Sequence, residues 1–168
     1  GLLRNLVVRT SRATGEIMVA LITSDDSAAV ANEYVPFLLA RVPAVTTIIH
    51  GINRKKAQIA FSEEVHVLHG SGTITERIAG NDFTISPFSF FQTNSGQAER
   101  LYDEALNAAQ LTGDQTAWDL YCGTGTITLA AAARADLALG VELNEGAVAD
   151  ARINAERNGV ENAVFIAG

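Results

Sequence analysis

The sequence predicts an α/β protein made of two parts, a small α+β domain followed by an incomplete parallel sheet. Strand-like and helix-like segments alternate over residues 117–166, as they do where crossover helices join parallel strands. Residues 1–85 instead show short strands, glycine-containing turns and one helix. We therefore expect an α+β domain at residues 1–88 and the first half of a Rossmann-like sheet, truncated, at residues 89–168.

A hairpin, a helix and a buried strand follow one another in the first part. The β-rich runs 6–9 and 17–22 are separated by a Thr-Gly pair, which is a hairpin signal. Residues 27–41 carry apolar side chains at helical spacing, and the β-branched run 45–49 is typical of a buried strand. Short strands with glycine turns are predicted over residues 65–85.

An aromatic-rich connector, residues 86–94, leads into the second part. A helix is predicted after it, because Asn94 is a capping residue type and Gln97 stands three positions later. We expect this helix to end near Gly113. Its predicted buried stripe consists of Leu101, Tyr102, Ala105, Leu106 and Ala109.

The rest of the second part repeats strand and helix. The predicted strands are 117–121, 137–142 and 163–166, and the predicted helices between them are 127–134 and 144–158. A Gly-Thr-Gly turn joins the first of these strands to the first of these helices.

The composition of the 168-residue chain, 48% hydrophobic and 18% charged, is that of a globular protein with a substantial core. No run approaches the roughly 18 apolar residues of a membrane helix, and the first residues lack a signal-peptide layout. We therefore expect a cytoplasmic protein that does not contact a membrane. One cysteine excludes an internal disulfide, and a strand would point His66 and His69 to opposite faces, so we expect no metal site.

The net charge of −7 argues against a nucleic-acid surface on this chain alone. The basic run Arg54–Lys56 is typical of a solvated turn. Any affinity for RNA must therefore come largely from elsewhere.

The strongest chemical signal is the run Asp119-Leu-Tyr-Cys-Gly-Thr-Gly-Thr126, followed by Glu142 at the end of the next predicted strand. A glycine turn after the first strand lets a ligand approach the backbone closely. The two oxygens of a carboxylate can accept both hydroxyl groups of a ribose. The pattern therefore predicts adenosine recognition, the alternative being a plain strand-to-helix turn.

Two features favour S-adenosylmethionine over a nicotinamide cofactor. The turn lacks the three-glycine fingerprint that makes room for a pyrophosphate. The carboxylate of Asp119 would repel phosphates and suit a cationic methionyl group.

The connector Ser86-Pro-Phe-Ser-Phe-Phe-Gln-Thr-Asn94 and the run Asp119–Gly125 together resemble the RNA (uracil-5-)-methyltransferases, which modify 23S ribosomal RNA or transfer RNA. The strand at residues 3–9 and the run His50–Asn53 are similar to the central domain of that family. The resemblance covers essentially the whole chain. It implies an S-adenosylmethionine-dependent enzyme of RNA methylation and ribosomal RNA processing, with ribosomal RNA favoured over transfer RNA.

The resemblance also implies that Gln92, Tyr121, Thr126 and Glu142 contact the cofactor. A Gln side chain offers both a donor and an acceptor to the amino-acid end of the ligand, although Gln92 could instead serve the start of the following helix. Tyr121 would pack against the methionyl chain, Thr126 would hold a carboxylate at a helix start, and Glu142 would bind the ribose.

The resemblance places the catalytic cysteine and base beyond Gly168, so the chain is expected to be an inactive fragment. In the family, a thiolate adds to C6 of uracil, C5 takes the methyl group, and a carboxylate removes the C5 proton. Cys122 lies in the cofactor-side motif and is expected to be a buried apolar residue. The RNA-binding barrel and iron–sulfur cysteines of the family are not found in this chain.

Two alternatives remain open at this point. The chain could be a non-catalytic module that binds RNA or protein, or a fragment of a nicotinamide-dependent oxidoreductase. An incomplete parallel sheet also leaves an open edge, through which copies of the fragment could associate.

Overall fold

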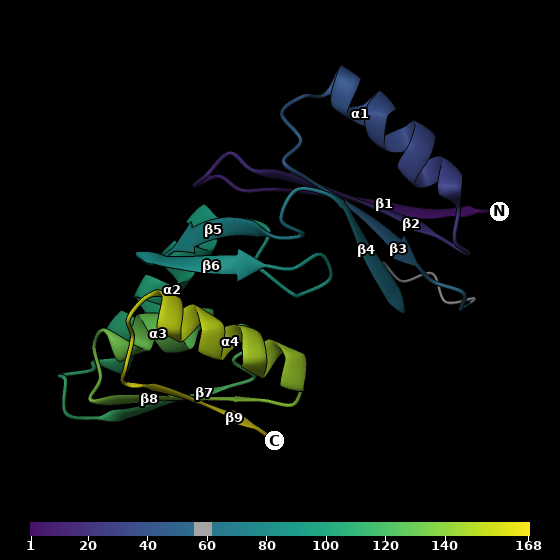
Figure 1. Ribbon diagram of the computed structural model, residues 1–168. Helices are drawn as coiled ribbons and strands as arrows, with labels where there is room; N and C mark the ends of the chain where they lie inside the picture. Colours follow the sequence, from purple (N-terminus) through teal and green to yellow (C-terminus); the bar gives the residue numbers. More distant parts are fainter. Residues whose placement is uncertain (56–61) are drawn as a thin grey trace. The chain divides into compact units, whose positions relative to one another are not determined.

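The computed structural model describes residues 1–55 and 62–168, and the chain divides into two compact units (Figure 1). Lys56, the last residue of the basic run, lies outside the described residues. The first unit consists of residues 1–75 and 85–88, and the second of residues 76–84 and 89–168.

The first unit is built on a four-stranded sheet whose strand order follows the chain: β1 (Leu3–Thr10), β2 (Ile17–Thr23), β3 (Thr47–Ile52) and β4 (Glu64–His69). The β1–β2 and β3–β4 pairs are antiparallel, and β2 and β3 are parallel. A parallel pair needs a crossover connection, which a helical segment supplies here.

The crossover is a π-helix, η1 (Val30–Tyr34), that continues into α1 (Val35–Arg41). The helix predicted for this region is therefore present. β3 begins at Thr47 rather than Val45, because the amide of Val45 bonds back to the carbonyl of Val42 in a turn (3.1 Å). All six residues of β3 are buried, which explains its apolar composition.

The second unit contains a three-stranded parallel sheet with three helices. The strands β7 (Thr116–Leu120), β8 (Leu137–Glu142) and β9 (Ala163–Ala167) lie in chain order, and the helices are α2 (Ser95–Ala109), α3 (Thr126–Ala132) and α4 (Glu145–Arg157). The predicted alternation of strand and helix is confirmed, as is the mixed α/β class.

Two short strands precede these elements, β5 (Ile74–Ile78) and β6 (Asn81–Ile85), and they pair with each other. Both residues of the intervening turn have positive φ, 50° at Ala79 and 79° at Gly80. Such a two-residue turn matches the twist of the strands it joins. Ile78 and Phe83 bring the pair into the buried core of the second unit, together with Tyr102.

α2 begins as predicted, because the side chain of Asn94 accepts a hydrogen bond from the amide of Gln97 (3.1 Å). It ends earlier than predicted, at Ala109. Gln110 adopts the left-handed conformation (φ 51°) that Gly113 was expected to supply.

The buried stripe of α2 is narrower than predicted. Tyr102 and Leu106 are buried, whereas Leu101 is 63% exposed. Ala105 and Ala109 line a pocket of about 310 Å³ beside the edge strand β7. The sheet is too narrow to cover a wider stripe, because no strand among the described residues pairs with the outer edge of β7.

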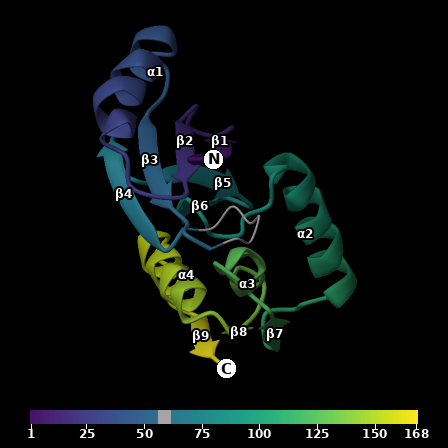
Figure 2. The same ribbon diagram turned by 90° about the vertical axis from the view of Figure 1, so that its right-hand side faces the viewer.

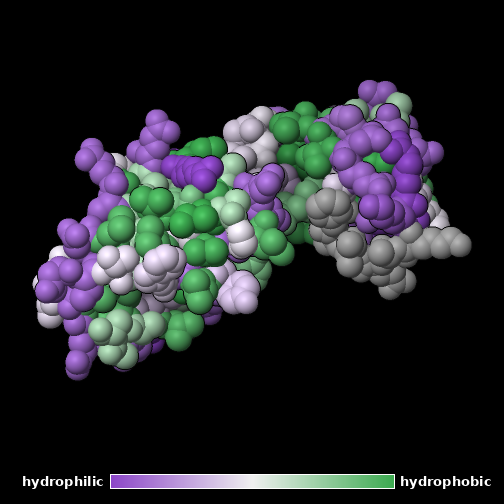
Figure 3. Space-filling view, turned by 90° about the horizontal axis from the view of Figure 1, so that it is seen from below, coloured by the Kyte–Doolittle hydropathy of each residue, from purple (hydrophilic) through white to green (hydrophobic). Residues whose placement is uncertain are grey.

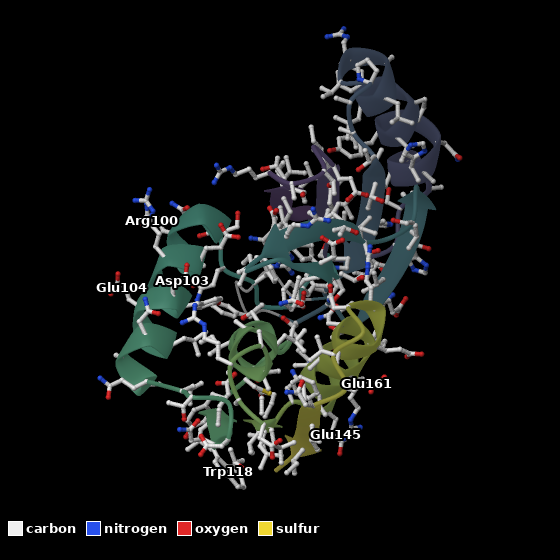
Figure 4. The ribbon with its side chains drawn as sticks, turned by 90° about the vertical axis from the view of Figure 1, so that its left-hand side faces the viewer. Arg100, Asp103, Glu104, Trp118, Glu145 and Glu161 are labelled. Carbon is white, nitrogen blue, oxygen red and sulfur yellow. The ribbon has the colours of Figure 1, made fainter. Side chains whose placement is uncertain are left out.

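One face of the β7–β8–β9 sheet is covered by α3 and α4, which lie on the same side of it (Figures 1 and 2). Apolar side chains gather on the opposite face, which Figure 3 shows from below. Strand register places them in two rows, Trp118–Leu139–Val164 and Leu120–Val141–Ile166. The four in the outer strands are 42–63% exposed, and Trp118 points away from the helices (Figure 4).

Among the described helices, none combines the length and the apolar character needed to cross a membrane.

Candidate functional site

The candidate site lies where β7 and β8 end side by side. The strands are parallel, with Leu120 opposite Val141, so their carboxyl ends meet at one edge of the sheet. Beyond the last pair, the amides of Tyr121 and Cys122 both donate to the carbonyl of Val141 (2.8 and 3.0 Å). In α/β sheets this edge is where ligands bind.

The turn after β7 brings its backbone close to α4 and β9. Gly123 and Gly125 have φ values of 54° and 87°, a region that other residues rarely adopt. A Cβ on Gly125 would collide with the ring of Phe165 and press on Ala151, so glycine is needed there for packing. The space around a Cβ on Gly123 is open within 4 Å, which leaves room for a ligand to approach the backbone.

Glu142 joins the end of β8 to this turn. One of its carboxylate oxygens, Oε2, accepts a hydrogen bond from the amide of Gly123 (3.1 Å), and Oε1 accepts one from the amide of Asn144 (2.9 Å). The side chain is only partly buried. Each carboxylate oxygen has a second lone pair, so the group can still accept hydrogen bonds from two ligand hydroxyls.

Tyr121 occupies a strained position at the entrance to the turn. Its φ is 70°, which costs a residue with a side chain about 1–2 kcal/mol. Its side chain is 88% exposed. The ring is therefore accessible to a ligand, one residue beyond the strand pair Leu120–Val141.

Thr126 is the first residue of α3 and follows the turn directly. Its hydroxyl lies 3.1 Å from the hydroxyl of Tyr102, which comes from the buried face of α2. This contact fixes the start of α3 against α2.

Gln92 lies in the connector ahead of α2, and its side chain is exposed. The preceding residue, Phe91, packs against the core of the second unit, with its ring centroid 5.9 Å from that of Phe83. Of the four predicted cofactor residues, Tyr121 and Thr126 flank the turn whose Gly123 amide bonds to the third, Glu142. No hydrogen bond within residues 62–168 ties the side chain of Gln92 to them.

Asp119 is held on the helix side of β7. Its carboxylate accepts a hydrogen bond from the hydroxyl of Thr128 on α3 (2.7 Å). Burial raises the pKa of Asp119, and the bonds from Thr128 oppose that rise. The carboxylate is thus tied to α3, and Asp119 pairs with Gly140, one position before the last pair of β7 and β8.

Cys122 lies between the two acidic groups of the site. Its side chain is buried, at 6% exposure. Burial, together with the negative charges of Asp119 and Glu142, raises the pKa of the Cys122 thiol to about 11. Such a thiol is a poor nucleophile, because little of it is present as thiolate near neutral pH.

The histidines do not assemble a metal site. Among residues 1–55 and 62–168, no group of three or more His, Cys, Asp or Glu side chains could hold a metal ion. His50 is buried, and its Nε2 lies 2.7 Å from the hydroxyl of Thr23. Because that hydroxyl donates to the carbonyl of Asp25, the imidazole donates to Thr23.

Sequence reasoning missed the buried polar residues that hold the turn after β7 and the start of α3. Tyr102 was expected to be an apolar stripe residue, and Asn154 was not singled out. Asn154 is fully buried and contacts the turn after β7. The signal available in the sequence was an asparagine in the apolar stripe of a helix, since a buried amide requires partners.

A glycine turn after the first strand, with an acid at the end of the second, defines a Rossmann-like α/β protein whose site suits a ligand with adjacent hydroxyls. The profile of the tRNA (Uracil-5-)-methyltransferase family matches residues 34–167. The chain therefore belongs to the tRNA (uracil-5-)-methyltransferase family.

Relatives and a solved structure agree with this assignment. An uncharacterised RNA methyltransferase of Chlorobaculum tepidum is 43% identical over 98% of this chain, and one of Enterococcus faecalis is 42% identical over all of it. The crystal structure of the Pyrococcus abyssi tRNA (uracil-54, C5)-methyltransferase with S-adenosyl-L-homocysteine is 30% identical, with a TM-score of 0.82 over the whole chain. This chain spans 34% and 37% of the two relatives and 39% of the P. abyssi chain.

The state of Cys122 gives a prediction about thiol reactivity. At pH 8 a thiol of pKa about 11 holds about 100-fold less thiolate than one at the ordinary value of 9.0. We expect iodoacetamide to alkylate the native chain at least about 100-fold more slowly than the chain unfolded in urea. Mass spectrometry of samples quenched over time measures both rates, and equal rates would contradict the burial and charge described for Cys122.

Proposed function

We propose that this chain forms the central part and the adenosine half-site of an enzyme that methylates C5 of uridine in RNA, with S-adenosylmethionine as the donor. The observation that carries the proposal is the carboxylate of Glu142, held at the end of β8 by the amide of Gly123. The P. abyssi relative, whose structure contains S-adenosyl-L-homocysteine, supports the choice of cofactor.

The residues present fit this cofactor. The space beside Gly123 is open, and both oxygens of Glu142 keep acceptor capacity for the ribose hydroxyls. We propose that Tyr121 packs its exposed ring against the ligand and that Gln92 and Thr126 bind the amino-acid end. Bound S-adenosylmethionine supplies an electrophilic methyl group on its sulfonium.

The charge distribution between the two units supports a role for the first unit in RNA binding. The first unit carries 7 Lys and Arg against 6 Asp and Glu, whereas the second carries 5 against 13. The acidity of the chain is therefore concentrated in the cofactor-binding unit. Asp103 and Glu104 on α2 are two of its exposed acidic residues (Figure 4). Phosphates would be repelled mainly there.

We propose a structured RNA, either 23S ribosomal RNA or transfer RNA, as the target. The names of the matched family and of the P. abyssi relative support transfer RNA. Both are structured RNAs that present a uridine, so the chemistry at C5 is the same for either target.

We also propose that the 168-residue chain transfers no methyl group by itself. The family reaction requires a reactive cysteine, and the single cysteine of this chain is buried with its pKa raised to about 11. We therefore expect the chain to bind the cofactor without transferring its methyl group.

Cofactor binding is tested by titrating the chain with S-adenosylhomocysteine in a calorimeter. We expect the wild-type chain to bind, and Glu142→Ala to weaken binding at least about 10-fold, because the hydrogen bonds to a charged group are lost. Glu145→Ala is the matched control, since this acid is the first residue of α4 and is exposed. Equal losses in the two variants, or undiminished binding by Glu142→Ala, would contradict the proposal.

The bare face of the second-unit sheet supports a further proposal, that copies of the isolated chain associate through it. Leu120 lies in this apolar face and is 63% exposed. Leu101 is equally exposed but lies on α2 rather than on the sheet. We expect Leu120→Glu to weaken self-association, measured by analytical ultracentrifugation, at least about 10-fold more than Leu101→Glu. A wild-type chain that remains monomeric when its concentration is raised 100-fold would refute the association.

A further inference from the structure

Asn154 on α4 makes hydrogen bonds to two separate segments of the second unit. Its Nδ2 donates to the carbonyl of Thr124 in the turn after β7 (3.1 Å), and its Oδ1 accepts from the amide of Thr84 in β6 (3.1 Å). One partner can only accept and the other can only donate, so a single orientation of the amide satisfies both. The side chain is fully buried, at 0% exposure.

The position of Asn154 on its helix aims it at the turn. Ala151 lies one helical turn earlier on the same buried face and would touch a Cβ on Gly125. The small side chain of Ala151 therefore lets the turn approach α4, and the amide of Asn154 then reaches the carbonyl between the two glycines. Glycine turns are soft, so a bond to the central carbonyl restricts the conformation of the whole turn.

The turn after β7 also fixes the carboxylate of Glu142. Gly123 precedes the carbonyl that Asn154 holds, and its amide donates to Oε2 of Glu142. A continuous chain of contacts thus runs from the buried amide of Asn154, through the turn, to the carboxylate proposed to bind the ribose. Asn154 itself is too deeply buried to touch the ligand.

We infer that Asn154 is a positioning residue for the cofactor, which orients Glu142 by holding the turn after β7. This inference rests on the proposed function for its effect on affinity, whereas its effect on the turn can be measured without a ligand. It also links the site to β6, because the same amide holds Thr84.

Asn158 provides a matched control on the same helix. Its Oδ1 accepts from the amide of Asp82 (2.8 Å), and its Nδ2 donates to the carbonyls of Asp82 and Asn154 (2.8 and 2.7 Å). It therefore holds the same strand, β6, with the same functional group, and its side-chain hydrogen bonds go to Asp82 and Asn154 rather than to the turn.

The test compares Asn154→Asp with Asn158→Asp. Each change preserves size and the acceptor for an amide of β6, and replaces the donating NH₂ by oxygen. At Asn154 the new oxygen faces the carbonyl of Thr124. We expect Asn154→Asp to weaken binding of S-adenosylhomocysteine about 10-fold more than Asn158→Asp, as measured by calorimetry.

A double-mutant cycle with Glu142→Gln separates positioning from general loss of stability. If Asn154 acts through Glu142, the extra loss caused by Asn154→Asp should fall below about threefold in the Glu142→Gln background. The inference is overturned if the loss persists in full there, or if the two Asp variants weaken binding equally in the wild-type background.

Amide hydrogen exchange of Gly123 in the free chain keeps the test independent of the ligand. We expect the Gly123 amide to exchange at least about 10-fold faster in Asn154→Asp, and at the wild-type rate in Asn158→Asp. Asn154→Ser, which removes both bonds without adding charge, is measured alongside in case the Asp variant does not fold. If the wild-type chain fails to bind S-adenosylhomocysteine, the proposed function fails, while an unchanged Gly123 rate would overturn the inference itself.

Discussion

The hydrogen bond between the amide of Gly123 and the carboxylate of Glu142 joins the turn after β7 to the last residue of β8, the strand that pairs with β7. It depends on the parallel pairing of those strands and on the positive φ of Gly123. It also leaves each carboxylate oxygen a further lone pair at the edge of the sheet. The chemistry proposed for the protein starts from this bond, because it presents a negative group where a ribose would bind.

The interior of the second unit supports that bond through small and polar residues. Gly140 on β8 has no room for a side chain, since a Cβ would collide with Phe165 and the sulfur of Cys122. That close packing places Cys122 in the core and raises its pKa, so the cysteine next to the site is structural. Asn154 and the Tyr102–Thr126 contact then fix the turn and the start of α3.

Much of this arrangement could be predicted from the sequence because it depends on local signals. The cap at Asn94, the alternation of strand and helix, and an acid ending β8 each follow from residues close together in the chain. The end of α2 could not be predicted, because Gln110 takes a conformation usually left to glycine. The buried stripe of α2 was overestimated, since its width depends on how many strands the sheet contains.

The long-range polar contacts were also beyond prediction. Asn154 bonds to Thr124 and Thr84, which lie 30 and 70 residues away in the chain. A sequence pattern marks such an asparagine as unusual in a helix stripe without naming its partners. The exposed rows on the bare sheet face likewise resemble core residues in the sequence, and their exposure reflects which elements this chain contains.

The most direct test of the central claim is a crystal structure of the chain with S-adenosylhomocysteine. We expect the ligand at the carboxyl ends of β7 and β8, with both ribose hydroxyls within about 3.2 Å of the Glu142 carboxylate. The Gly123 amide should still donate to that carboxylate. A ligand bound elsewhere, or a ribose that does not contact Glu142, would contradict the account of this site.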